Sequence, residues 1–127
     1  MLKTHGNILT LTGHPKRADL ISAIVEMYRV AVTHLPVDVV TGLKTGLKRE
    51  TNPRAKHVLK TMLQNIDMAD CETKPLCQDT GIPLVYVKYQ SKKYKQLELK
   101  KIIKEATTLA TKEVPMRANA YDLIQGK

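Results

Sequence analysis

The sequence predicts a mainly helical α+β domain. Apolar residues recur every three or four positions over four long stretches, which is typical of helices that bury one face. A single β-prone run at 84–87 separates the third stretch from the fourth. The chain has 127 residues, 43% of them hydrophobic but none Phe or Trp, so aliphatic and methionine side chains must fill its core. This length suits one small domain or part of a larger one.

The four segments expected to be helical cover approximately 18–35, 36–50, 51–71 and 95–113. Pro36 ends the first segment and opens the second, in which Gly42 and Gly46 weaken the apolar stripe. The third segment has the clearest start, because Asn52 can cap a helix whose first residue is Pro53.

The region between the third and fourth helices is expected to be a loop followed by a strand. Pro75 and Gly81 mark the loop, and the apolar run "IPLVYVKY" marks the strand. A lone strand leaves backbone groups unpaired, so this one needs a partner. The N-terminal stretch "NILTLT" or another chain could supply it. The tail after 113 lacks periodicity.

The chain is basic, with 21 Lys and Arg against 12 Asp and Glu and a formal net charge of +9. This charge is compatible with a phosphate-bearing partner, an anionic substrate or a solvated surface. The lysines are scattered and no nucleic-acid-binding motif accompanies them, which favours the solvated surface. No apolar run of 18 residues and no signal peptide is evident, so a cytoplasmic protein without a membrane span is expected.

The two cysteines lie close together, at Cys71 and Cys77. A reducing compartment disfavours a disulfide between them, and their spacing and the scattered histidines do not fit a zinc site. As a nucleophile, Cys77 lacks a histidine nearby in sequence, although one could lie close in space. Composition alone favours structural thiols, with Cys71 buried at a helix end. Cys77 differs, because the polar residues 78–80 that follow it are more plausible facing a ligand than the core.

The stretch "KPLCQDTGIPLVYV" closely resembles the signature of the class I, iron–sulfur fumarate hydratases and the related L(+)-tartrate dehydratase alpha subunits. The segment "LPVDVVTGLKTGLKRETNPRAKHVLKTMLQNIDMA" is similar to the helical N-terminal region of this family, and "KEVPMRANAYD" to a later segment. The resemblance covers 18–127, the N-terminal part of an alpha-type domain, and leaves 1–17 as an extension.

The resemblance implies that Cys77 is one of three cysteine ligands of a 4Fe–4S cluster whose fourth iron is left open for substrate. Thiolates are the ligands that such irons prefer. The open iron would act as a Lewis acid on the substrate. The implied reaction is reversible removal of water from a 2-hydroxy dicarboxylate, either malate to fumarate or tartrate to oxaloacetate.

The resemblance also implies roles at the substrate. Gln78 would donate to a carboxylate oxygen, Asp79 would take part in proton transfer, and Arg117 would clamp a carboxylate with its fork of donors. Thr80 and Gly81 would shape the turn. Asn119 matches a further position of the family, to which we assign only a supporting role.

The chain departs from the family pattern in two places. After the expected strand it has "KYQSKKYKQ" where the family has a glycine, and it stops at "QGK" before the segment with the other cluster cysteines. Cys71 matches no ligand position, so activity is expected to require the rest of the alpha region and a beta subunit, in an oligomer. Two alternatives remain: a non-catalytic binding or assembly module derived from the family, and a basic nucleic-acid-binding domain.

Overall fold

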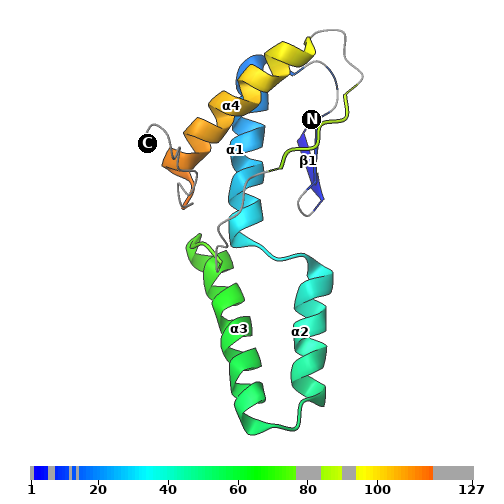
Figure 1. The fold of residues 1–127 in the computed structure, drawn as a ribbon, viewed down its shortest axis with the longest axis vertical. Helices are drawn as coiled ribbons and strands as arrows, with labels where there is room; N and C mark the ends of the chain where they lie inside the picture. The colour runs from blue at the N-terminus through cyan, green and yellow to red at the C-terminus, as the bar shows by residue number, and fades with distance from the viewer. Residues whose placement is uncertain are drawn as a thin grey trace, which may run out of the picture.

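The computed structural model describes residues 2–5, 8–11, 13, 15–76, 84–89 and 94–115. They form β1 (Leu2–His5), β2 (Ile8–Leu11), α1 (Arg17–Thr33), α2 (Val37–Arg49), α3 (Pro53–Glu72) and α4 (Gln96–Glu113). Figure 1 shows α4 lying across α1, while α2 and α3 run side by side and extend away from them. The prediction of a mainly helical chain is confirmed, and each helix begins and ends within two residues of its expected bounds.

The contact between α1 and α4 contains the most deeply buried side chains. Ile102, Ala106 and Ala110 recur every four residues along α4, and each is at most 1% exposed. Because two of these three side chains are alanine, α1 can approach α4 closely, and Val25 of α1 is buried against Ala110. Burying a large aliphatic side chain contributes about 1.5–3 kcal/mol. This helix pair is therefore the main source of stability in the described part of the chain.

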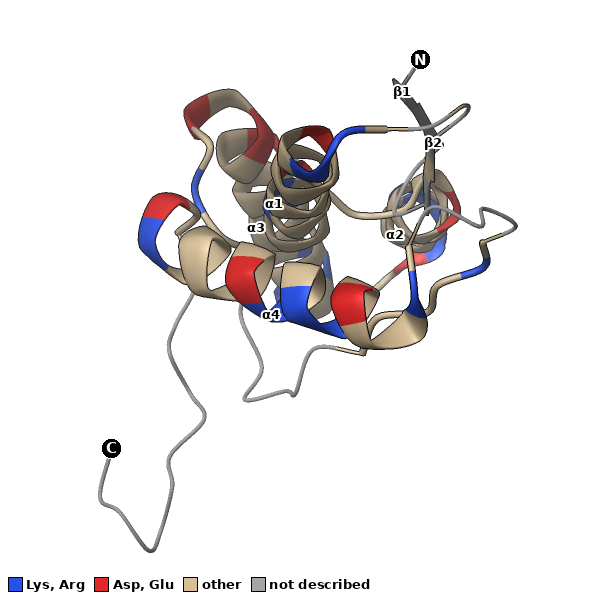
Figure 2. Ribbon diagram, turned by 90° about the horizontal axis from the view of Figure 1, so that it is seen from above, with Lys and Arg blue, Asp and Glu red and all other residues tan. Residues whose placement is uncertain are grey.

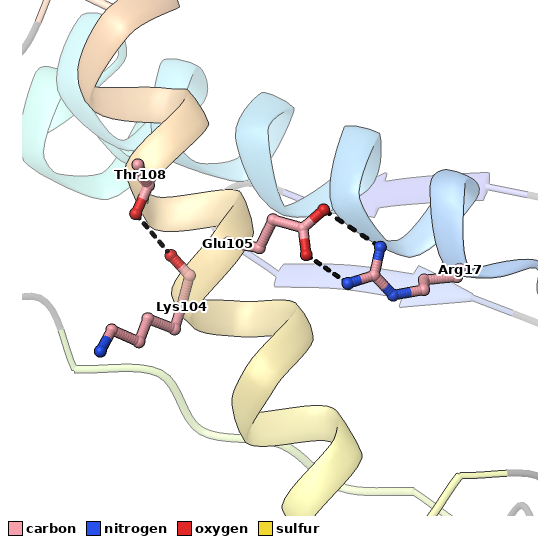
Figure 3. Close-up of polar contacts among 4 residues, drawn as sticks. All are labelled: Arg17, Lys104, Glu105 and Thr108. Atoms are coloured by element: carbon pink, nitrogen blue, oxygen red, sulfur yellow. Dashed lines mark hydrogen bonds and ion pairs between the residues drawn. The ribbon is translucent and has the colours of Figure 1, made fainter.

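Polar contacts connect the same two helices. Arg17, at the start of α1, forms a two-pronged ion pair with Glu105 of α4, with 3.0 Å between Arg17 Nη1 and Glu105 Oε1 (Figure 3). Farther along, the Tyr28 hydroxyl lies 2.9 Å from Thr107 Oγ1. The Arg17 and Glu105 side chains are about half exposed, so their pair adds little stability. The pair joins the start of α1 to the middle of α4.

The α2–α3 pair is packed more thinly. No residue of α2 and only Ala69 of α3 is buried. Val58 and Met62, one turn apart on α3, are 50% and 48% exposed, so part of the predicted apolar stripe remains uncovered. The periodicity predicted these helices correctly, but nothing among the described residues covers this flank of α3.

The start of α3 matches its sequence signal. The Asn52 side chain accepts hydrogen bonds from the backbone N–H groups of Arg54 at 2.9 Å and Ala55 at 3.4 Å, and Pro53 is the first helical residue. The Glu50 carboxylate accepts from the two backbone N–H groups that follow it, at 2.8 and 2.9 Å. These hydrogen bonds, that of the Asn52 N–H above all, hold the pKa of Glu50 below its ordinary value.

The strand expected from the β-prone run at 84–87 is not present. These residues form no strand, and Leu84 and Tyr86 are 76% and 91% exposed. The stretch "NILTLT" does not pair with them, because β2 within it pairs with β1 in an antiparallel hairpin whose register joins Leu2 to Leu11. A β-prone run becomes a strand only when a partner satisfies its backbone groups. No described strand takes that place here.

The stretch Arg17–Arg49 is long and apolar enough, by length and composition alone, to cross a membrane. This is weak evidence, because the core helix of a soluble protein passes the same test. The stretch also contains two separate helices, since α1 ends at Thr33 before Pro36 and α2 begins at Val37. The expectation of a chain without a membrane span therefore stays a prediction.

We expect that shortening a buried side chain of α4 greatly lowers the free energy of unfolding. Replacing Ile102, 1% exposed, with alanine leaves a cavity and should lower the free energy of unfolding by about 2–5 kcal/mol. Leu97→Ala is the matched control on the same helix, since Leu97 is 67% exposed and should cost less than about 0.5 kcal/mol. Urea denaturation measures both, and similar losses would contradict this assignment of the core.

The cap of α3 allows a second test. Asn52→Ala removes the acceptor for two backbone N–H groups and should lower the free energy of unfolding by about 0.5–2 kcal/mol. Thr51→Ala, a change at the preceding exposed residue, should stay within about 0.5 kcal/mol of wild type. Thermal unfolding followed by circular dichroism distinguishes the two. An Asn52→Ala variant as stable as wild type would show that the cap is dispensable.

Candidate functional site

The residues predicted to carry chemistry lie outside the described part of the chain. They are Cys77, Gln78, Asp79, Thr80, Gly81, Arg117 and Asn119. Their predicted roles therefore stay predictions. What the structure describes is the segment that leads directly into the first five of them.

This segment turns sharply after α3. Thr73 follows the last helical residue and adopts a left-handed conformation, with φ 52° and ψ 39°. The next backbone N–H, that of Lys74, donates to the Ala69 carbonyl at 3.1 Å, which closes the end of the helix. The Leu76 N–H then donates to the Val32 carbonyl of α1 at 2.8 Å. The residue immediately before Cys77 is thus attached to the C-terminal end of α1.

A second contact joins the same helix ends. His34 caps the C-terminus of α1, and its Nε2 lies 2.6 Å from Asp70 Oδ1 on α3. The other ring nitrogen, Nδ1, lies 2.7 Å from Thr33 Oγ1. The Thr33 hydroxyl donates to the Arg29 carbonyl at 2.8 Å. Both nitrogens of this imidazole therefore have a partner.

The Thr33, His34 and Asp70 side chains resemble a nucleophile, a base and an orienting carboxylate in their connectivity. Their surroundings exclude that function. Thr33 is only 1% exposed, and its hydroxyl proton is directed at a carbonyl of its own helix. A nucleophile must reach a substrate, so the group is structural.

Sequence reasoning did not find this arrangement. In the sequence, His34 is one of four scattered histidines, and no local pattern singles out Asp70. The helix ends predicted near 35 and 71 lie close to both residues. Periodicity, however, does not reveal which helix ends lie side by side, and that was the missing information.

Cys71 lies in the last turn of α3, as predicted, but it is exposed rather than buried. It is a free thiol. In the described ranges no three or more His, Cys, Asp or Glu side chains are grouped so that they could hold a metal ion. The described residues therefore provide no metal centre of their own.

Comparison with known proteins shows the family to which the chain belongs. A sequence model described as "Fumarate hydratase (Fumerase)" matches residues 21–127. A "Putative L(+)-tartrate dehydratase subunit alpha" from Methanocaldococcus jannaschii is 40% identical over 99 residues, which are 76% of this chain and 34% of that protein. A "Putative fumarate hydratase class I" from Geobacillus stearothermophilus is 37% identical over 105 residues, 80% of this chain and 20% of that protein.

The L(+)-tartrate dehydratase subunit alpha of Escherichia coli K12 is 37% identical over 91 residues, 72% of this chain and 30% of that protein. The relatives are thus named as hydratases and dehydratases, enzymes of the hydro-lyase class. Within that class, the chain belongs to the fumarate hydratase family. It spans about a third or less of the length of these curated relatives.

The left-handed conformation of Thr73 leads to a prediction about stability. A β-branched residue in this conformation costs about 1–2 kcal/mol, whereas glycine adopts it freely. Thr73→Gly should therefore raise the free energy of unfolding by about 0.5–1 kcal/mol. Thr73→Ala keeps the Cβ and should stay within about 0.5 kcal/mol of wild type. Urea denaturation of the three proteins tests this, and a destabilised Thr73→Gly variant would contradict it.

Proposed function

We propose that this chain forms one part of the active site of an iron–sulfur hydro-lyase. The enzyme would reversibly remove water from a 2-hydroxy dicarboxylate, converting malate to fumarate or tartrate to oxaloacetate. The observation that carries the proposal is the match over 21–127 to the fumarate hydratase family, together with relatives named as hydratases and dehydratases. The match includes the "CQDTG" motif, whose chemistry suits this reaction.

In this proposal, the chain's own residues bind the substrate and move a proton. The Gln78 amide donates to a substrate carboxylate oxygen, and the Arg117 guanidinium pairs with a carboxylate through two parallel hydrogen bonds. Asp79 accepts or returns the proton that accompanies the loss of water. The formal charge of +9 favours the approach of a dianionic substrate.

The residues present do not suffice for a 4Fe–4S cluster. Such clusters are held by several thiolates, and this chain has two cysteines, of which Cys71 is exposed at the end of α3. In the proposal, Cys77 is one ligand and the remaining cysteines belong to the rest of the alpha region. When bound, the cluster would activate the hydroxyl group that leaves.

The proposed assembly also includes a second subunit. Two of the relatives are named as alpha subunits of L(+)-tartrate dehydratase, a name that implies a further subunit. We propose that this chain works with the remaining part of an alpha region and with a beta subunit, in an oligomer located in a reducing cytoplasm. The uncovered flank of α3 and the unpaired residues 84–89 are compatible with such partners.

A second candidate is a non-catalytic assembly module that keeps the helical fold. It is favoured by one observation, namely that the chain has too few cysteines to hold a cluster alone. A nucleic-acid-binding domain has less support. Figure 2 shows basic and acidic residues interspersed along α4.

A chimera tests the proposed function. We suggest replacing the matched 99 residues of the Methanocaldococcus jannaschii alpha subunit with the corresponding part of this chain. After anaerobic reconstitution with a beta subunit, fumarate hydration and tartrate dehydration would be assayed against the unmodified relative. The chimera should be active, Cys77→Ser should lose activity, and Cys71→Ser should keep it. Arg117→Lys should raise KM about tenfold or more, because the two-pronged pairing is lost.

Other outcomes would count against the proposal. A well-folded chimera with neither activity, beside an active relative, would favour the assembly module. Activity retained in Cys77→Ser would remove the proposed cluster ligand. If Cys71→Ser and Cys77→Ser lose activity equally, the two thiols are not functionally distinct.

A further inference from the structure

We propose that His34 and Asp70 are positioning residues that fix where the loop beginning at Cys77 leaves the helical scaffold. This inference rests on the proposed function only in that the loop is taken to carry the active-site residues. The contacts that support it all lie within the described part of the chain. None of them involves a predicted ligand or substrate contact.

The turn after α3 is attached to α1 at both of its ends. Before the turn, Asp70 accepts from His34 Nε2 at 2.6 Å. After the turn, Leu76 donates its backbone N–H to the Val32 carbonyl at 2.8 Å. Residues 70–76, which include the left-handed Thr73, are therefore held against residues 32–34. A chain segment attached at two points has fewer accessible conformations than one attached at a single point.

Contacts on both sides of the ring fix the orientation of His34. The Arg29 carbonyl can only accept, so the Thr33 hydroxyl donates its proton there, and the Thr33 oxygen lies 2.7 Å from His34 Nδ1. Asp70, as a carboxylate, also only accepts, so His34 Nε2 donates to it. The ring is therefore held between the C-terminal ends of α1 and α3.

Charged side chains near His34 and Asp70 form ion pairs with other residues. Arg29, one turn earlier on α1, pairs with Glu26 at 3.0 Å, and Lys74 pairs with Glu72 in the turn itself. His34 and Asp70 are 48% and 59% exposed, so their pair contributes little to global stability. Their effect should instead be local, on the attachment of Leu76.

The experiment is site-resolved hydrogen exchange on the 127-residue chain, followed by NMR. In His34→Ala and in Asp70→Asn, the Leu76 amide should exchange about three to five times faster than in wild type, as expected for loss of one exposed side-chain pair. The urea midpoint should not change. Asp67→Asn, which alters an exposed carboxylate one turn earlier on α3, is the matched control and should leave Leu76 unchanged.

Two further variants test whether the residues act as a pair. The double variant His34→Ala/Asp70→Asn should exchange at Leu76 no faster than either single variant. His34→Arg places guanidinium donors opposite Asp70 and should restore slow exchange. The alkylation rate of Cys77, mapped by mass spectrometry, should rise in the single variants and return in His34→Arg.

The proposal is overturned if Leu76 exchange and Cys77 alkylation stay at wild-type rates in both single variants. It is also overturned if all amides of α1 and α3 accelerate equally, since the pair would then only stabilise the fold. These readouts need no enzyme activity. An inactive chimera would therefore count against the proposed function and leave this inference to be decided by exchange and alkylation.

Discussion

The packing of α1 against α4 is the contact on which the rest of the structure depends. Ala106 and Ala110 let the two helices approach, and Ile102, one turn earlier on α4, is buried at 1% exposure. This contact fixes α1, and the C-terminal end of α1 in turn receives the end of α3 through Val32 and His34. Leu76, the residue before the "CQDTG" motif, is thus connected to the core by a short series of contacts.

The packing of α2 against α3 buries fewer side chains. α2 buries no residue, and the flank of α3 that carries Val58 and Met62 remains about half exposed. All residues of 84–89 except Val85 are also exposed, and the stretch forms no strand. These features fit a chain that spans about a third or less of its curated relatives. An apolar flank and an unpaired β-prone run gain most from added polypeptide, which is the arrangement proposed for the assembled enzyme.

Much of this architecture could be predicted from sequence, because helix periodicity and capping are local signals. Asn52 and Pro53 located the start of α3, and Pro36 separated α1 from α2. The strand prediction was wrong because β-propensity does not show whether a partner strand is present. The pairing of His34 with Asp70 was missed, since it depends on which helix ends meet. For Cys77, Gln78, Asp79 and Arg117, the predicted roles follow from family resemblance and stay predictions.

The most direct test of the central claim is hydrogen–deuterium exchange on this chain, alone and mixed with the remaining part of a tartrate dehydratase alpha subunit. If the chain is one segment of a hydro-lyase, residues 84–89 and the Val58–Met62 flank of α3 should exchange quickly alone. Both should become protected in the mixture, while the buried part of α4 changes little. Unchanged exchange at both regions, with the two polypeptides well folded, would contradict the account.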